Sequence, residues 1–181
     1  MSNGASCDLS GLDLSNQDLY GAALAGANLS NANLSGSLLV EINLEKATLT
    51  GANLSRATLM GSRLSQANLT EANLSNADLY NALMIKADLT GAILTEADLT
   101  SAVISDANLS KAVVTSAKLQ GAILSGSKLI DADFSSSKMR NTKLLNADLT
   151  GTKFQAADLL NSLMPDGTTY NGNVAKFGAS Q

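Results

Sequence analysis

Histidine and tryptophan are absent from this chain of 181 residues, and proline and cysteine occur once each. Without histidine the chain lacks the commonest protein metal ligand and the commonest acid–base residue. The single cysteine, Cys7, excludes an internal disulfide. Three Phe and three Tyr are few for the core of an ordinary globular domain. These absences argue against catalysis and against a conventional core.

Long apolar runs are also missing. No stretch approaches the roughly 20 apolar residues of a membrane span, so we expect no membrane insertion. Residues 1–6 are too few and too polar to form a secretion signal. We therefore expect a cytoplasmic protein, with the periplasm or the thylakoid lumen as alternatives if a leader has been removed.

The net charge of −4 hides an asymmetry along the chain. Through Ser110 there are 11 acids and four bases, whereas from Lys111 onward there are five acids and eight bases. The outward bases of this second part are Lys118, Lys128, Lys138, Arg140, Lys143 and Lys153. They are dispersed and not interleaved with aromatic residues, so we expect no direct nucleic-acid binding. Solvated surface, head-to-tail steering between rods and a polar binding partner all remain as interpretations.

What the chain does have is a five-residue repeat that runs from Cys7 to Asp166 without a slip. Of its 32 central residues 25 are Leu, and the other seven are also apolar. The residue two positions before each centre is small, except at Leu12, Gln17 and Ile42. A unit this short cannot bury a core alone and must stack on its neighbours. The repeat therefore predicts a single elongated domain.

The period of five also predicts the shape of the stack. In a helix of about 100° per residue the leucines would spread around the cylinder, and in a flat strand they would alternate between faces. A short extended segment followed by a corner places Ala27 and Leu29 inside and Asn28 outside. Four such sides make a coil of 20 residues, and the repeats make about eight coils. The recurrent glycines at the corners suit turns with positive φ.

The outward carboxylates have a structural explanation. Asp88, Asp98, Asp148 and Asp158 each precede a centre by one residue, where a carboxylate can bond neighbouring backbone. No phosphate-binding loop, dinucleotide fingerprint or serine with a partner base is present. We therefore expect no enzyme, no cofactor and no metal site.

Ala27-Asn28-Leu29-Ser30-Asn31 and Ala97-Asp98-Leu99-Thr100-Ser101 follow the pattern A-(D/N)-L-x-x. This motif resembles that of the pentapeptide-repeat family, over nearly nine-tenths of the chain. The resemblance implies a right-handed quadrilateral parallel β-helix of the all-β class, with the handedness taken from the family alone. The ending Met164-Pro165-Asp166-Gly167-Thr168 is similar to that of several cyanobacterial members.

The two ends of the rod need covering, because an open coil exposes edges and core leucines. We expect residues 1–6 to be a short lead-in, 7–166 the β-helix, and 167–181 a C-terminal cap that contains Tyr170, Val174 and Phe177. Cys7 occupies an inward position and should pack structurally, while bulky Leu12 and Gln17 could plug the first coil. Otherwise the first coil is an association surface, most simply of an end-to-end homodimer.

Residues 20 positions apart should lie above one another. On this register two adjoining sides carry more exposed apolar residues than the others, which are mostly Ser, Thr, Asn and Asp. β-Propensity alone is the competing explanation. The candidate interaction surface consists of Tyr20, Leu38, Val40, Met60, Tyr80, Leu83 and Ile85.

These observations favour a non-catalytic scaffold that acts by protein–protein interaction with an unknown partner. The family resemblance implies an alternative, a DNA-mimicking protein that binds DNA gyrase and protects it from quinolones. Such members are strongly acidic along the rod and dimerise through a C-terminal helix, whereas this chain has a basic C-terminal third. A regulatory role is implied for a few cyanobacterial relatives.

Overall fold

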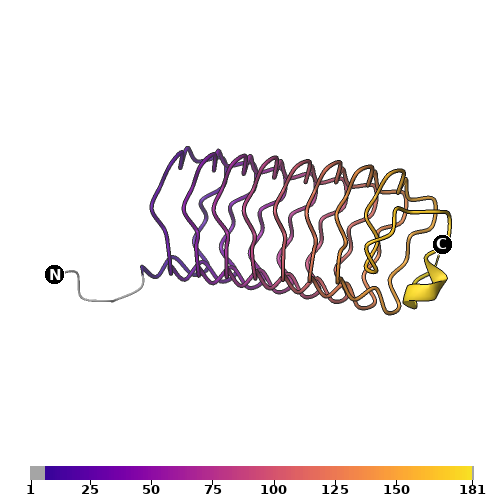
Figure 1. Ribbon diagram of the computed structural model, residues 1–181. Coiled ribbons are helices and arrows are strands. Elements are labelled where there is room, and N and C mark those ends of the chain that lie inside the picture. The colour runs from indigo at the N-terminus through magenta and orange to yellow at the C-terminus, as the bar shows by residue number, and fades with distance from the viewer. Residues whose placement is uncertain (1–6, 181) are drawn as a thin grey trace.

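The computed structural model describes residues 7–180, in which the chain winds into a rod of stacked coils (Figure 1). Each side of a coil contributes one bridged residue, which pairs in parallel with the residue 20 positions later, as Asp8 does with Asn28. This register continues without a break as far as the pair of Lys143 with Leu163. The bridges are isolated, so the only named element in the described range is the 3₁₀ helix η1, Ala175–Phe177.

Backbone hydrogen bonds join each coil to the next on all four sides. The Leu9 N–H donates to the Asn28 carbonyl at 2.7 Å, and the Asn28 N–H donates to the Cys7 carbonyl at 2.9 Å. The same pair of bonds recurs along the rod. The ladder satisfies backbone groups that would otherwise be buried without partners.

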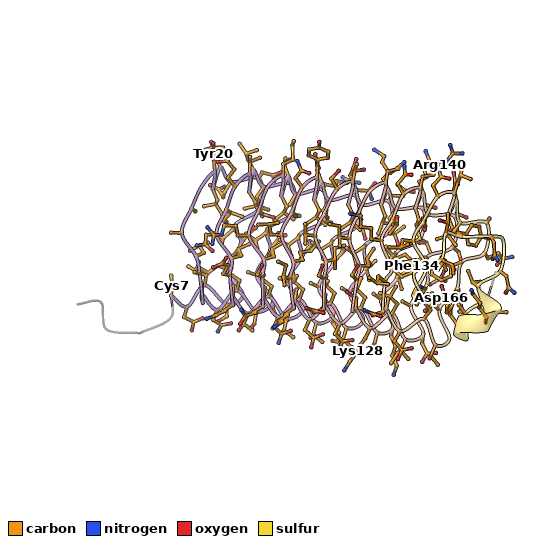
Figure 2. The ribbon with its side chains drawn as sticks, viewed as in Figure 1. Cys7, Tyr20, Lys128, Phe134, Arg140 and Asp166 are labelled. Atoms are coloured by element: carbon orange, nitrogen blue, oxygen red, sulfur yellow. The ribbon has the colours of Figure 1, made fainter. Side chains whose placement is uncertain are left out.

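The interior consists of the central residues and the small residues that precede them. Every centre from Leu29 to Met164 is at most 1% exposed. Burial of one leucine side chain contributes about 2 kcal/mol before the entropy of ordering is subtracted. Phe134 (labelled in Figure 2) lies one coil before Phe154 on the same side, and the two rings stack with centroids 5.7 Å apart. The inward alanines leave room for these large side chains.

Hydroxyls at the small positions, except that of Ser62, are bonded to the backbone. Ser137 Oγ donates to the Phe134 carbonyl at 2.6 Å, and Thr152 Oγ1 donates to the Leu129 carbonyl at 2.8 Å. Within residues 7–180 the hydroxyl of Ser62 is the one buried side-chain polar atom that has no protein partner. Polar residues therefore enter the core where a carbonyl lies within reach.

The corners confirm the expectation of positive φ and extend it beyond glycine. Gly121 has φ of 70°, and the Ala122 N–H closes the turn by donating to the Leu119 carbonyl at 3.0 Å. Within residues 7–180, twenty-one non-glycine residues adopt the same left-handed conformation at other corners, among them Ser116 at 57°. Stacking thus imposes one turn geometry on the corners from Gly11 to Asn161, whichever residue occupies them.

Outward Asp and Asn residues stabilise these corners. Asp98 Oδ1 accepts the backbone N–H of Thr100 at 3.0 Å, and Asp88, Asp148 and Asp158 accept the corresponding N–H on their own sides. The expected structural role of these carboxylates is confirmed.

The first coil differs from the sequence-based expectation. Cys7 is exposed and does not pack, Leu12 is 47% exposed, and Gln17 is also exposed, so neither bulky residue plugs the coil. An inward position is buried by the coils on both sides of it, and among the described residues the first coil has a neighbour on one side only. The lead-in expected at residues 1–6 lies outside the described range.

The tail after Asp166 crosses the last coil. The Met164 N–H donates to the Thr168 carbonyl at 2.7 Å, and the Phe154 N–H donates to the Ser180 carbonyl at 2.7 Å. Val174 is 2% exposed, while Tyr170 and Phe177 are partly buried against the core. The tail therefore supplies both ladder bonds and apolar cover at this end.

The corner geometry predicts opposite effects of the same substitution at two serines. Ser116→Gly should raise the free energy of unfolding by about 1 kcal/mol, because glycine adopts a left-handed conformation without the Cβ penalty. Ser125→Gly, at a described position without positive φ, should lower it by about 0.5 kcal/mol. Urea denaturation followed by circular dichroism measures both, and equal shifts would contradict the prediction.

The tail predicts a large effect at Val174. Val174→Asp would bury a carboxylate against the core and should destabilise the protein by about 3 kcal/mol. Asn171→Asp introduces the same charge at an exposed tail position and should change stability little. Hydrogen exchange at the Phe154 amide locates the effect, and unchanged protection in Val174→Asp would show that the tail does not cover the last coil.

Candidate interaction surface

Four of the predicted residues stand in one outward column, which we call the tyrosine column: Tyr20, Val40, Met60 and Tyr80. They occupy successive coils of the third side, which is held in register by the parallel pairing of Asp18, Leu38, Thr58 and Asp78. Tyr20 is 60% exposed, Tyr80 40% and Met60 38%, while Val40 is half-buried. Coils about 4.8 Å apart place these side chains in contact range of one ligand.

A groove runs along the tyrosine column at the corner of the coil. It is lined by Val40, Glu41, Met60, Gly61, Tyr80 and Asn81. At the end nearest the first coil, the Tyr20 hydroxyl donates to Glu41 Oε2 at 3.1 Å, and this bond to a carboxylate raises the pKa of Tyr20. The surface thus combines apolar side chains with phenol and carboxylate groups at its edge.

The two tyrosines project from a fixed backbone. Asp18 Oδ1 accepts the N–H of Tyr20, and Asp78 Oδ1 accepts the N–H of Tyr80, each at 3.0 Å. Because these bonds belong to a hydrogen-bonded coil, the backbone position of each tyrosine is fixed before a partner binds.

The remaining predicted residues extend the apolar surface around the next corner. Leu38 lies on the third side and is 39% exposed. Leu83 and Ile85 flank the buried Met84 on the fourth side and are 39% and 38% exposed. The structure thus places all the candidate residues on two adjoining sides.

The 20-residue register of the sequence places Arg140 in this column, after Thr100 and Gln120, but sequence reasoning did not assign Lys118 and Lys138 to the same side. Lys118, Lys138 and Arg140 are on the third side too, beyond Thr100. Tyr20 and Arg140 lie along one long edge of the rod, whereas Lys128 lies on the opposite edge (Figure 2). The same register, applied to the lysines, would have found the positions of Lys118 and Lys138. It would also have shown that Ile93 and Val113, both exposed, adjoin each other on the second side.

The three cations differ in how they are paired. Lys118 Nζ lies 3.0 Å from Asp98 Oδ2, and the Arg140 Nε–H donates to Asp158. The bond from Arg140 lowers the pKa of the Asp158 carboxyl below its ordinary value. Lys138 has no ion pair or side-chain hydrogen bond within residues 7–180, and it lines a second groove with Gln120, Ser136 and Arg140.

The described residues hold neither a group of metal ligands nor a membrane-spanning helix. Across residues 7–180 no three acidic or cysteine side chains gather as metal ligands would. The sole helix in that range has three residues, so no helix there has the length and apolar character needed to cross a membrane. The side chains present can bind by apolar contact, hydrogen bonding and charge pairing.

The hydrogen bond between Tyr20 and Glu41 predicts a pH effect. The carboxylate stabilises the protonated phenol, so Glu41→Gln should lower the pKa of Tyr20 toward its ordinary value. Glu45→Gln is the control, because Glu45 pairs with Arg63 and not with a phenol. Tyrosinate absorbance, assigned by comparison with Tyr20→Phe, measures the shift. An unchanged titration in Glu41→Gln would show that the bond does not form.

Comparison with known proteins gives a family match over almost the whole repeat. The model of the Pentapeptide repeats family matches eight copies that together span residues 5–164. No curated protein shows a significant sequence match to the chain.

Solved structures agree with this match. A pentapeptide repeat protein from the thylakoid lumen of Arabidopsis thaliana is 39% identical over 54% of this chain and 68% of its own, with a TM-score of 0.53. HetL of the cyanobacterium Nostoc, described as involved in heterocyst differentiation regulation, is 31% identical over 93% of both chains, with a TM-score of 0.36. QnrB1, a plasmid-mediated fluoroquinolone resistance protein, is 20% identical over 84% of this chain and 88% of its own, with a TM-score of 0.57. The predicted right-handed β-helix is confirmed, and the chain belongs to the pentapeptide repeat family.

Proposed function

We propose that this protein is a non-catalytic scaffold that binds another protein through the tyrosine column and the apolar residues beside it. The observation that carries the proposal is the exposure of large apolar side chains on two adjoining sides, from 38% at Met60 and Ile85 to 60% at Tyr20. Apolar residues that adjoin one another on a soluble protein tend to mark interaction sites.

The residue types suit recognition. Tyrosine supplies a large apolar contact and a polar end, and it is enriched among the residues that dominate binding energy. Methionine adapts to irregular partner surfaces. The rigid coil beneath them reduces the entropy lost on binding, because the backbone of the column is already ordered.

The gyrase-binding alternative is less well supported by the charges. Residues 107–146 contain six bases and only two acids, and so interrupt any continuous acidic surface. A DNA mimic must reproduce the dense negative charge of the duplex over its length. The likeness to QnrB1 concerns the fold, and the involvement of HetL in regulation is consistent with a partner-binding role without selecting one.

The open edge of the first coil is the place that we propose for a second copy of the chain. In the described structure the backbone N–H groups of Asp13, Asp18 and Ala23 form no hydrogen bond. Such an edge can accept another chain, and end-to-end pairing about a two-fold axis would cover both edges at once.

The test is a comparison of two triple variants. Combined Tyr20→Ala, Met60→Ala and Tyr80→Ala should weaken capture of a native-host partner about tenfold or more, as expected for removal of dominant contacts. Thr50→Ala, Thr70→Ala and Thr90→Ala alter the same corner positions on the first side and should leave capture unchanged.

Quantitative affinity capture and solution mass are measured on both variants. A lower solution mass for the tyrosine variant than for the wild type would identify the partner as a second copy of this chain. If the tyrosine variant retains every partner and the wild-type mass while remaining folded, the proposed surface is wrong.

A further inference from the structure

The third side combines two kinds of surface along one line. Its first four coils carry the tyrosine column, and its sixth and seventh coils carry Lys118, Lys138 and Arg140. Thr100 and Gln120 separate them, and the Thr100 hydroxyl donates to Gln120 Oε1 at 3.5 Å. From Tyr20 to Arg140 there are six steps between coils, or about 29 Å at the usual ladder spacing.

At the cationic end of the third side, some hydrogen-bond donors have no partner within the described residues. Arg140 engages Asp158 through Nε, and its two terminal amino groups have no partner in the described range. Lys138 is exposed and unpaired there, and it shares its groove with Arg140 and Gln120. Asp98 and Asp158 flank the cations, so the groove favours a few placed carboxylates over a dense polyanion.

We propose that the third side binds one extended polypeptide segment of a partner protein, whose apolar residues lie on the tyrosine column and whose carboxylates meet Lys138 and Arg140. This inference rests on the proposed function and adds the chemistry of the partner. An extended segment rises about 3.3 Å per residue, so nine or ten residues would cover the distance.

The dimensions favour a segment over a second folded copy. A stable pair of folded surfaces usually buries about 800 Å² on each partner, whereas the tyrosine column is one side wide and about 14 Å long. Two copies aligned antiparallel along their whole third sides would also set the cations of one against the apolar residues of the other. The third side is narrow and straight, with an apolar end and a cationic end. It therefore fits an extended ligand that is apolar at one end and acidic at the other.

The test uses defined peptides of about twelve residues, long enough to span both features. The matched peptide carries Leu and Phe in one half and Glu in the other, and it is made in both orders. One comparison peptide has Lys in place of Glu, and another has Ser in place of Leu and Phe. In fluorescence anisotropy, one order of the matched peptide should bind at least about tenfold more tightly than either comparison, and added salt should weaken it.

Two double variants with the same loss of charge locate the site. Lys138→Gln with Arg140→Gln should weaken the matched peptide about tenfold, as expected for loss of its charge partners. Lys128→Gln with Lys153→Gln removes two cations from other sides and should leave the affinity within about twofold. Each of these control lysines lies near a carboxylate, Lys128 near Asp148 and Lys153 near Asp133, as Arg140 lies near Asp158. Thermal unfolding checks that all variants fold.

The outcomes separate this inference from the proposed function. If the tyrosine variant weakens the peptide and the Lys138/Arg140 variant does not, the acidic half of the inference is wrong and the apolar surface stands. If both double variants weaken binding equally, the attraction is non-specific and the inference is overturned. Absence of matched-peptide binding in either order also overturns it, whereas the proposed function is decided separately by capture of host partners.

Discussion

The parallel pairing of each bridged residue with the residue 20 positions later is the interaction on which the rest of the structure depends. It stacks the leucines, brings the inward alanines between them, and closes the backbone ladder on all four sides. It also imposes a left-handed corner after every centre from Leu9 to Leu159, even at residues such as Lys111 that pay a conformational penalty for it. The penalty is local, whereas the ladder bonds and the buried leucine are gained in every repeat.

The sequence predicts the interior of the rod well because the repeat carries the same information many times. Inward Ala27 and Leu29, outward Asn28 and the bonded carboxylates all follow from a five-residue period and four sides. The ends are different. Cys7 and Leu12 satisfy the inward pattern but are exposed, because burial in a stacked coil depends on a neighbour that no single repeat contains. The path of the tail likewise depends on contacts with distant residues, such as those of Ser180 with Thr152 and Phe154.

The apolar part of the candidate surface and the position of Arg140 in its column were predictable, whereas the position of Lys138 was missed. Tyr20 and Tyr80 stand out because large aromatic residues are rare in the chain. Lys138 does not stand out, since lysine is ordinary at an exposed position and the charge asymmetry concerns the whole C-terminal third. Only its place on the third side, in line with the tyrosines, distinguishes it from Lys128 on the opposite edge.

The separation of core from surface explains how a regular repeat can present a distinctive pattern of side chains to a partner. The inward positions must be small or apolar, but the residues just before and just after each centre point outward and are not limited by the core. Each column can therefore present its own sequence of side chains at a fixed spacing. A flexible segment that binds such a column loses conformational entropy, which limits its affinity. Specificity must then come from the pattern, with apolar contacts and charges required together at a set separation.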